Sequence, residues 1–254
     1  MIRFESITKK LGGNTVLDGI DYEIEPRETF VIVGASGAGK SVCLKHMVRL
    51  LTPDSGRVMV DGACVSDARG EELDRIRELF GFLFQGSALL QWLSVGDNVG
   101  LPLRMKTNLS DTEIDRRVQE KLEMVDLPEV FDKQPGELSG GMRKRVGLAR
   151  AIVTEPKIIL YDEPTSGLDP VTSRTIDRLI NQLRTELKVT SVVVTHDLHS
   201  ALAIGSRIAM LNEGKMIEVS TPEEFVKSKN EFVRGFLEAQ YITTQGEWEK
   251  AEPS

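Results

Sequence analysis

The stretch GASGAGKS, residues 34–41, constrains the fold of this chain more than any other segment. It follows a short apolar run, ETFVIVG (28–34), and precedes KSVCLKHMVRLL (40–51), whose apolar residues recur with a helical period. Strand, glycine-rich loop and helix in this order fit the pattern G-x-x-x-x-G-K-S, whose backbone amides surround a phosphate group. The segment therefore predicts an α/β fold with a nucleotide-phosphate site.

Each residue type in this loop suits phosphate binding. Glycines permit backbone turns that side chains would block, and they let the amides wrap a β-phosphate. Lys40 would reach the β- and γ-phosphates, and the Ser41 hydroxyl would coordinate Mg²⁺. The predicted nucleotide-binding residues of the loop are Gly34, Ala35, Ser36, Gly37, Ala38, Gly39, Lys40 and Ser41.

A pair of acids closes a second apolar run, IILYDEP (158–164). Ligands bind at the carboxyl ends of the strands in open parallel sheets. We expect Asp162 to hold Mg²⁺, directly or through water, and Glu163 to polarise the attacking water as a general base. An exposed turn is the alternative explanation for such a pair.

Two more polar residues follow predicted strands. His196 ends VVVTH, and the strand order places it beside the γ-phosphate, so we predict a γ-phosphate sensor rather than a structural histidine. Gln85 ends GFLFQ and is predicted to bridge Mg²⁺ or the attacking water and to connect the site with the helical segment that follows.

The strand patterns frame a helical insertion. Strands are predicted at 2–11 and 16–26 around the turn Gly12-Gly13, and at 56–62, 80–85, 157–163, 190–196 and 207–214. Residues 87–155 lack strand patterns, and a capping box at 110–113 precedes a stripe of Ile114, Val118, Leu122 and Val125. Helices at 170–188 and 197–204 indicate crossover units. The predicted organisation is a domain over 1–221, with the insertion at about 87–155, and a helical tail over 222–254.

Composition excludes some function classes. The net charge of −7 argues against broad nucleic-acid binding, and the basic run 143–145 is better explained as a solvated helix face. Cys43 and Cys64 have no metal or redox spacing, and Cys43 is expected in the core. No apolar stretch approaches the ~20 residues of a membrane helix. If the protein serves a membrane, other chains must cross it.

Taken together, these motifs resemble those of ATP-binding-cassette (ABC) ATPases. The phosphate loop, Gln85, LSGGM (138–142), LYDEP, SGLDP (166–170) and His196 stand in that family's order over about residues 2–220. The resemblance implies an α/β phosphate-loop NTPase cassette, with a mixed sheet core, an N-terminal antiparallel part and a helical subdomain. It also implies ATP hydrolysis with Mg²⁺.

Members of this family pair head to tail, and the LSGG segment of one covers ATP held by the other. By that resemblance Ser139, Gly140 and Gly141 would contact the γ-phosphate of a second copy's ATP, with Asp169 connecting the sites across the interface. The apolar run within 87–103 is expected in the core of the insertion, with a groove that receives a helix from a permease as the alternative. The tail from 222 is expected to pack on its own core or to contact the second copy.

The sequence departs from the family pattern at two positions. Leu11 stands where many cassettes have an aromatic residue that stacks on adenine, and Met142 stands where many have glutamine. The segments LSGGMRKRVGLARAI and 82–103 are similar to ATPases of Mla-type lipid transporters, which work with a permease and an MCE-type lipid-binding protein. This implies an ATPase that lies at the cytoplasmic face of the cell membrane and serves phospholipid transport. The alternatives are an importer ATPase for a small polar solute, a soluble ABC machine and a non-hydrolysing regulatory cassette.

Overall fold

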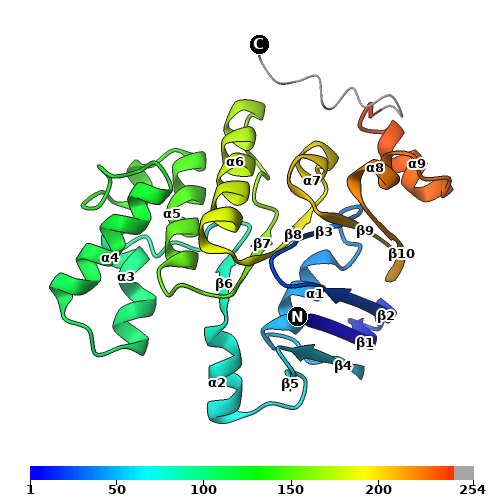
Figure 1. The fold of residues 1–254 in the computed structure, drawn as a ribbon, viewed down its shortest axis with the longest axis horizontal. Coiled ribbons are helices and arrows are strands. Elements are labelled where there is room, and N and C mark those ends of the chain that lie inside the picture. The colour runs from blue at the N-terminus through cyan, green and yellow to red at the C-terminus, as the bar shows by residue number, and fades with distance from the viewer. Residues whose placement is uncertain (243–254) are drawn as a thin grey trace. The chain divides into compact units, whose positions relative to one another are not determined.

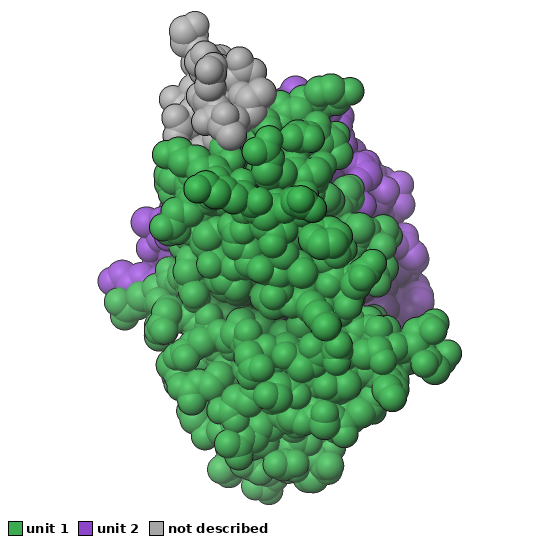
Figure 2. Space-filling view, turned by 90° about the vertical axis from the view of Figure 1, so that its right-hand side faces the viewer, with its two compact units in different colours: residues 1–76, 192–254 green, residues 77–191 purple. Residues whose placement is uncertain are grey.

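The computed structural model describes residues 1–242, which form parts of two compact units. Unit 1 comprises residues 1–76 and 192–254, and unit 2 comprises residues 77–191 (Figure 2). The helices and strands named below are labelled in Figure 1. The chain leaves unit 1 after its phosphate loop and first sheet, and it returns within the strand that precedes His196.

The first sheet of unit 1 is antiparallel, with the strand order β2-β1-β4-β5. Its strands are β1 (Ile2–Leu11), β2 (Asn14–Ile24), β4 (Ser55–Val60) and β5 (Ala63–Cys64). The predicted glycine turn between β1 and β2 is confirmed, because Gly12 and Gly13 have φ values of 57° and 85°. The two-residue strand β5 has too little pattern for prediction.

The other strands of unit 1 run in the order β10-β9-β3-β8. They are β3 (Thr29–Val33), β8 (Thr190–Thr195, which begins in unit 2), β9 (Arg207–Asn212) and β10 (Lys215–Ser220). Strand β3 is parallel to β9, whereas β10 returns antiparallel to β9. Sequence reasoning missed β10, because its side chains are mostly half-buried and show little alternation.

An aromatic stack fills the core of unit 1 beside the phosphate loop's strand. Tyr22 stacks on Phe4 at 4.4 Å and on Phe30 at 5.5 Å between ring centroids. The guanidinium of Arg207 lies 5.1 Å from the centre of the Phe30 ring and pairs with Glu28 at 2.7 Å. These contacts connect β1, β2, β3 and β9.

Unit 1 contains short helices. They are α1 (Lys40–Met47), α2 (Gly70–Glu78, which ends in unit 2), α7 (Leu198–Ile204), α8 (Pro222–Val226) and α9 (Glu231–Glu238). Helix α1 stops four residues before its predicted end, since Arg49 adopts a left-handed φ of 52°. Cys43 is fully buried in α1, as predicted. Residues 243–254 of the expected tail lie outside the described residues.

Unit 2 joins two parallel strands to the helical segment. Its elements are β6 (Phe80–Leu83), α3 (Val95–Lys106), α4 (Asp111–Met124), a 3₁₀ turn (Pro135–Glu137), α5 (Gly140–Ile152), β7 (Ile158–Asp162) and α6 (Pro170–Leu187). Strand β6 ends two residues before Gln85, so the prediction that the strand ends at Gln85 was wrong. No helix of the described residues is long and apolar enough to span a membrane.

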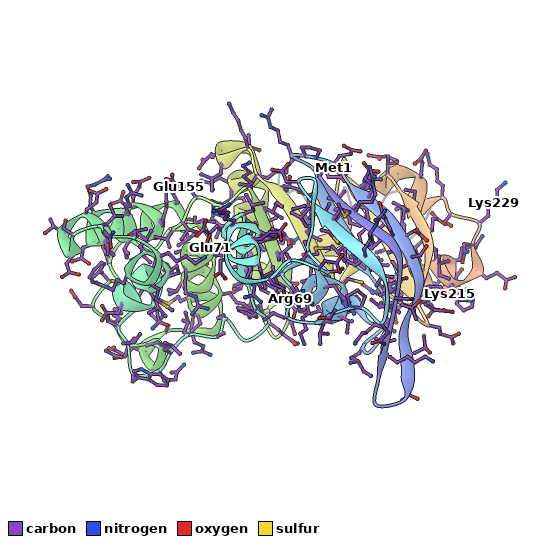
Figure 3. The ribbon with its side chains drawn as sticks, turned by 90° about the horizontal axis from the view of Figure 1, so that it is seen from below. Met1, Arg69, Glu71, Glu155, Lys215 and Lys229 are labelled. Atoms are coloured by element: carbon purple, nitrogen blue, oxygen red, sulfur yellow. The ribbon has the colours of Figure 1, made fainter. Side chains whose placement is uncertain are left out.

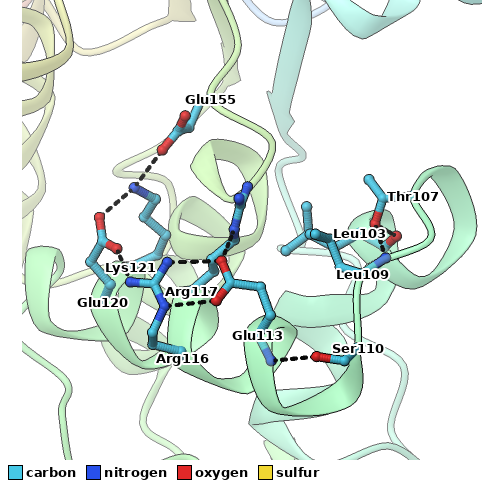
Figure 4. A network of polar contacts seen from close by, with 10 residues as sticks. All are labelled: Leu103, Thr107, Leu109, Ser110, Glu113, Arg116, Arg117, Glu120, Lys121 and Glu155. Atoms are coloured by element: carbon cyan, nitrogen blue, oxygen red, sulfur yellow. Dashed lines mark hydrogen bonds and ion pairs between the residues drawn. The ribbon is translucent and has the colours of Figure 1, made fainter.

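Helix α4 confirms the stripe read from the sequence, since Ile114, Val118, Leu122 and Val125 are all buried. Ser110 caps the helix by accepting the Glu113 amide at 3.3 Å (Figure 4). The Glu113 carboxylate accepts hydrogen bonds from Arg116 and Arg117, which lower its pKa to about 2. In a full capping box the Glu113 carboxylate would accept the Ser110 amide. Here it forms ion pairs on the helix surface.

Candidate nucleotide-binding and catalytic site

The glycines of the phosphate loop are fixed by close backbone contacts. A Cβ at Gly34 would lie 2.3 Å from the Leu211 carbonyl oxygen, and one at Gly39 would lie 2.9 Å from the Val16 carbonyl oxygen. Gly39 also has a left-handed φ of 104°, and Gly37 has a φ of 82° with open space where its Cβ would be. Glycine is therefore required at positions 34 and 39, where a side chain would collide with neighbouring backbone between β3 and α1.

The start of α1 supplies positive charge to this loop. Lys40 is buried, and its Nζ donates to the carbonyl oxygens of Gly34 at 2.8 Å and Ala35 at 3.0 Å. Gly39 precedes the helix and offers no side-chain cap, so helix N–H groups and a lysine ammonium converge on the loop. A cradle of glycine backbone with one buried cation fits the phosphates of a nucleotide.

His196 follows the last residue of β8, which ends at Thr195, one residue before the predicted end at His196, and Gly34 follows the last residue of β3. Strands β3 and β8 are neighbours in the sheet. The His196 side chain is exposed, and Asp197 caps α7 by accepting the amides of His199 and Ser200. The histidine thus stands at a rigid junction between a strand and a helix.

The acidic pair lies in unit 2 at the end of β7. Asp162 is the last residue of the strand and Glu163 follows it, and each has 8% of its surface exposed. The exposed-turn explanation for this pair is therefore wrong. Glu163 adopts a left-handed φ of 49°, which is unfavourable for a residue other than glycine and is typical of functional sites.

A buried lysine of α5 holds this strained turn. The Nζ of Lys144 donates to the carbonyl oxygen of Glu163 at 3.0 Å and to that of Gln85. Burial lowers the pKa of Lys144, while the charges of Asp162 and Glu163 oppose that shift. One ammonium therefore bridges the backbones of the predicted general base and the predicted Mg²⁺ or water ligand.

Lys144 corrects one expectation and was missed as a functional residue. Within the basic run 143–145 it is buried, so a solvated helix face does not describe it. Its spacing of three residues from Gly141 and four from Leu148, both buried, is the helical signal that places it on the inner face of α5.

A second cation of α5 fixes the chain after Gln85. Arg150 donates to the carbonyl oxygens of Ser87 at 2.5 Å and Ala88 at 2.7 Å. Both acceptor residues have left-handed backbones, with φ values of 62° and 48°. Burial lowers the pKa of Arg150. Gln85 itself is exposed at the start of this fixed loop.

The LSGG segment forms the N-terminus of α5. Ser139 caps the helix by accepting the Met142 amide at 3.2 Å, and both Ser139 and Gly140 are exposed. A Cβ at Gly141 would lie 2.4 Å from Cγ2 of Thr172, whose hydroxyl donates to Asp169 at 2.5 Å. That hydrogen bond is the main cause of the lowered pKa of Asp169. Unit 2 therefore connects the LSGG segment to Asp169 through one threonine.

The predicted Mg²⁺ ligands offer a hydroxyl, an amide and a carboxylate oxygen from Ser41, Gln85 and Asp162. Hard oxygen ligands of this kind suit Mg²⁺, which usually retains waters and phosphate oxygens as well. Within residues 1–242, no group of three or more histidine, cysteine or acidic side chains could hold a metal ion.

The structure therefore brings the predicted residues together in two sets. In unit 1, the loop 34–41 and His196 follow neighbouring strands. In unit 2, Lys144 joins Gln85 to Glu163, and Thr172 joins Gly141 to Asp169.

Comparison with known proteins yields consistent similarities. A family model described as "ABC transporter" matches residues 17–166. The chain is 38% identical to a probable ribonucleotide transport ATP-binding protein of Mycobacterium leprae, over all of this chain and 73% of that protein. It is 37% identical to the methionine import ATP-binding protein MetN 2 of Pseudomonas entomophila, over 97% and 75% of the two chains.

A solved structure shows the same fold. The dimeric, post-hydrolysis ATP-binding cassette MJ0796 bound to ADP and Pi matches with a TM-score of 0.80 and 36% identity, over 87% of this chain and 99% of that one.

Proposed function

Because the chain belongs to the ABC transporter family and is an ATPase of that family, we propose that it drives a separate membrane permease at the cytoplasmic face of the cell membrane. The proposal depends on ATP hydrolysis. The observation that carries it is the glycine cradle with Lys40, together with the acidic turn that Lys144 holds. The first set suits ATP phosphates, and the second suits activation of water.

In the proposed reaction, Lys40 neutralises the β- and γ-phosphates while the loop amides hold them. The Glu163 carboxylate accepts a proton from the attacking water, and His196 senses the γ-phosphate. Ser41, Gln85 and Asp162 are the proposed Mg²⁺ ligands, and the ion would neutralise charge that develops on the phosphates. Lys144 keeps Glu163 oriented through its backbone, without touching the nucleotide.

We further infer that two copies pair head to tail around ATP. The exposed Ser139 and Gly140 at the start of α5 support this arrangement, since helix N-termini attract anions. Asp169, joined to the same segment through Thr172, is the proposed connection across the interface. The two copies would close on ATP and open after hydrolysis, and this movement would drive the conformational change of the permease.

A phospholipid-type cargo is our proposal for the transporter as a whole, with an MCE-type lipid-binding protein as a further partner. Its support is the similarity of 138–152 and 82–103 to ATPases of Mla-type lipid transporters. An importer of a small polar solute is the second candidate, and it is favoured by the methionine importer among the relatives. Both share the same proposed ATP chemistry.

Purification of the intact complex separates these cargoes. The chain is tagged, membranes are extracted in mild detergent, and bound proteins and lipids are identified by mass spectrometry. A permease with an MCE-type protein and phospholipid would support lipid transport. A permease with a solute-binding protein would support a small-solute importer instead. If all partners were soluble ribosomal or DNA-associated proteins, the proposed role in transport would be wrong.

A further inference from the structure

The segment that carries His196 is held by contacts of two kinds. Its local contacts are short in sequence: Thr195 accepts the Asp197 amide at 3.0 Å, and Asp197 accepts the amides of His199 and Ser200 at 2.9 and 3.2 Å. These bonds leave the His196 carbonyl and the Leu198 amide, the first N–H of α7, to other partners.

Gln240, more than forty residues later in the chain, contacts both of these backbone groups. Its Nε2 donates to the carbonyl oxygen of His196 at 2.8 Å, and its Oε1 accepts the amide of Leu198 at 2.9 Å. The ring Nε2 of His199 lies 3.2 Å from the Gln240 carbonyl oxygen and completes the contact as a donor. A single carboxamide, which is both donor and acceptor, therefore spans the backbone on either side of Asp197.

The turn after α9 fixes the position of Gln240. Val233 and Leu237 bury one side of α9, and Ile242 is buried beyond it. The Ile242 amide donates to the Leu237 carbonyl at 3.1 Å, across a left-handed Tyr241 with a φ of 58°. This is the closing pattern of a helix C-terminus that usually contains glycine.

Tyr241 does not repay this backbone cost through its own packing, since its side chain is 90% exposed. The segment that leads into α9 is also solvent-facing, and Lys229 points away from the ribbon (Figure 3). The end of α9 is therefore anchored by Leu237, Ile242 and the Gln240 bridge.

We propose that Gln240 is a positioning residue that holds the His196 backbone and so couples the C-terminal helices to γ-phosphate sensing. The inference rests on the proposed role of His196. When α9 is docked, the Gln240 carboxamide holds the His196 carbonyl group and the first amide of α7, so the imidazole extends from a rigid backbone. When α9 is displaced, the His196 backbone loses this support while the phosphate loop remains intact.

The test measures ATP hydrolysis and ATP affinity of the full chain with Gln240→Ala and Gln240→Glu. Ala removes both bonds, whereas Glu keeps an acceptor for Leu198 and loses the donor to His196. We expect kcat to fall about tenfold in both variants, because a displaced catalytic group loses reaction geometry. ATP affinity stays near that of the unchanged chain. Gln182→Ala, which removes a surface contact to Glu186, is the matched control.

The double variant distinguishes positioning of His196 from plain helix capping: in a His196→Ala background, Gln240→Ala should lower kcat no further. Amide exchange at Leu198 reports the bond itself and should accelerate in every Gln240→Ala chain. An unchanged kcat in Gln240→Ala, or full additivity with His196→Ala, overturns the proposal. If His196→Ala alone leaves hydrolysis intact, the proposed role of His196 fails, and the exchange data still report whether Gln240 holds the segment.

Discussion

At the scale of single residues, the site depends on strained backbone that buried cations stabilise. Glu163 has a left-handed backbone, and its carbonyl oxygen accepts a hydrogen bond from Lys144 Nζ at 3.0 Å. This bond holds the backbone in place. Arg150 similarly holds Ser87 and Ala88. Strain of about 1–3 kcal/mol per residue persists only where neighbours over-determine the conformation.

Lys144→Met keeps most of the side-chain volume and removes the bridge. We expect kcat for ATP hydrolysis to fall about 10- to 100-fold, with ATP affinity little changed, because Glu163 loses its backbone anchor. The buried Glu163 carbonyl, left without this donor, would also lower the free energy of unfolding by roughly 1–3 kcal/mol. Lys106→Met, on the exposed end of α3, is the control. Wild-type kcat in a folded Lys144→Met chain would contradict the positioning role.

His46 gives the fold a pH dependence. Burial in α1 lowers its pKa below the 6.5 of an unperturbed histidine, against the opposing hydrogen bond to the Val42 carbonyl at 2.6 Å. The unfolded chain therefore binds a proton first as the pH falls through 6.5, and the free energy of unfolding decreases there. Denaturant titrations at pH 7.5 and 5.5 measure this loss. His46→Asn should flatten the dependence, and an equal slope in that variant would refute the assignment.

At the scale of elements, α5 organises unit 2. Its N-terminus carries the LSGG segment, its inner face carries Lys144, and its last turns carry Arg150. Gly141 sets the distance to α6, because Thr172 occupies the space of its missing Cβ. The same threonine binds Asp169, so one contact connects two motifs that are far apart in the sequence.

Gly141→Ala tests this connection. The added methyl group meets Cγ2 of Thr172, and overpacking of this kind costs about 1–3 kcal/mol. We expect a lower melting temperature and slower ATP hydrolysis. Thr172→Ser removes the obstructing methyl group but keeps the hydroxyl for Asp169, so the double variant should recover both quantities in large part. No recovery in the double variant would show that Thr172 is not the obstacle.

The sequence predicted strands and helices best where period and capping agreed. The stripe of α4 and the glycine hairpin of β1 and β2 are both present. Strand β10 was missed because its half-buried residues carry no clear alternation. Strand β6 ends earlier than predicted, because the apolar residues before Gln85 continue into a loop held by Lys144 and Arg150.

The motif residues proposed for the site were named from the sequence, but the residues that hold them in place were not. Lys144 and Gln240 act through backbone carbonyls and amides, and such contacts leave no pattern of residue types. The sequence gives no sign of the role of Thr172 either, since that role depends on the close approach of α5 and α6. Helical spacing from Gly141 and Leu148 is the one signal that could have identified Lys144 as inward-facing, but the run 143–145 was assigned to a solvated helix face.

At the scale of the whole molecule, the proposed ATP site needs two copies, because one chain would supply the phosphate loop and the other the LSGG segment. Ser139→Arg places a long cation at the exposed start of α5. We expect it to abolish ATP-dependent pairing, since the side chain would fill the space of the second copy's phosphates. ATP binding to the single chain should persist. Light scattering with and without ATP measures the pairing, and unchanged dimerisation would refute the head-to-tail arrangement.

The central claim is that Glu163 activates water for ATP hydrolysis. The most direct measurement is the turnover of Glu163→Gln, which preserves the size of the side chain and one accepting oxygen but not its basicity. We expect that ATP still binds and that turnover falls roughly 10²- to 10⁴-fold, the range for loss of a general base. Near-normal hydrolysis in a chain that binds ATP would contradict the assignment.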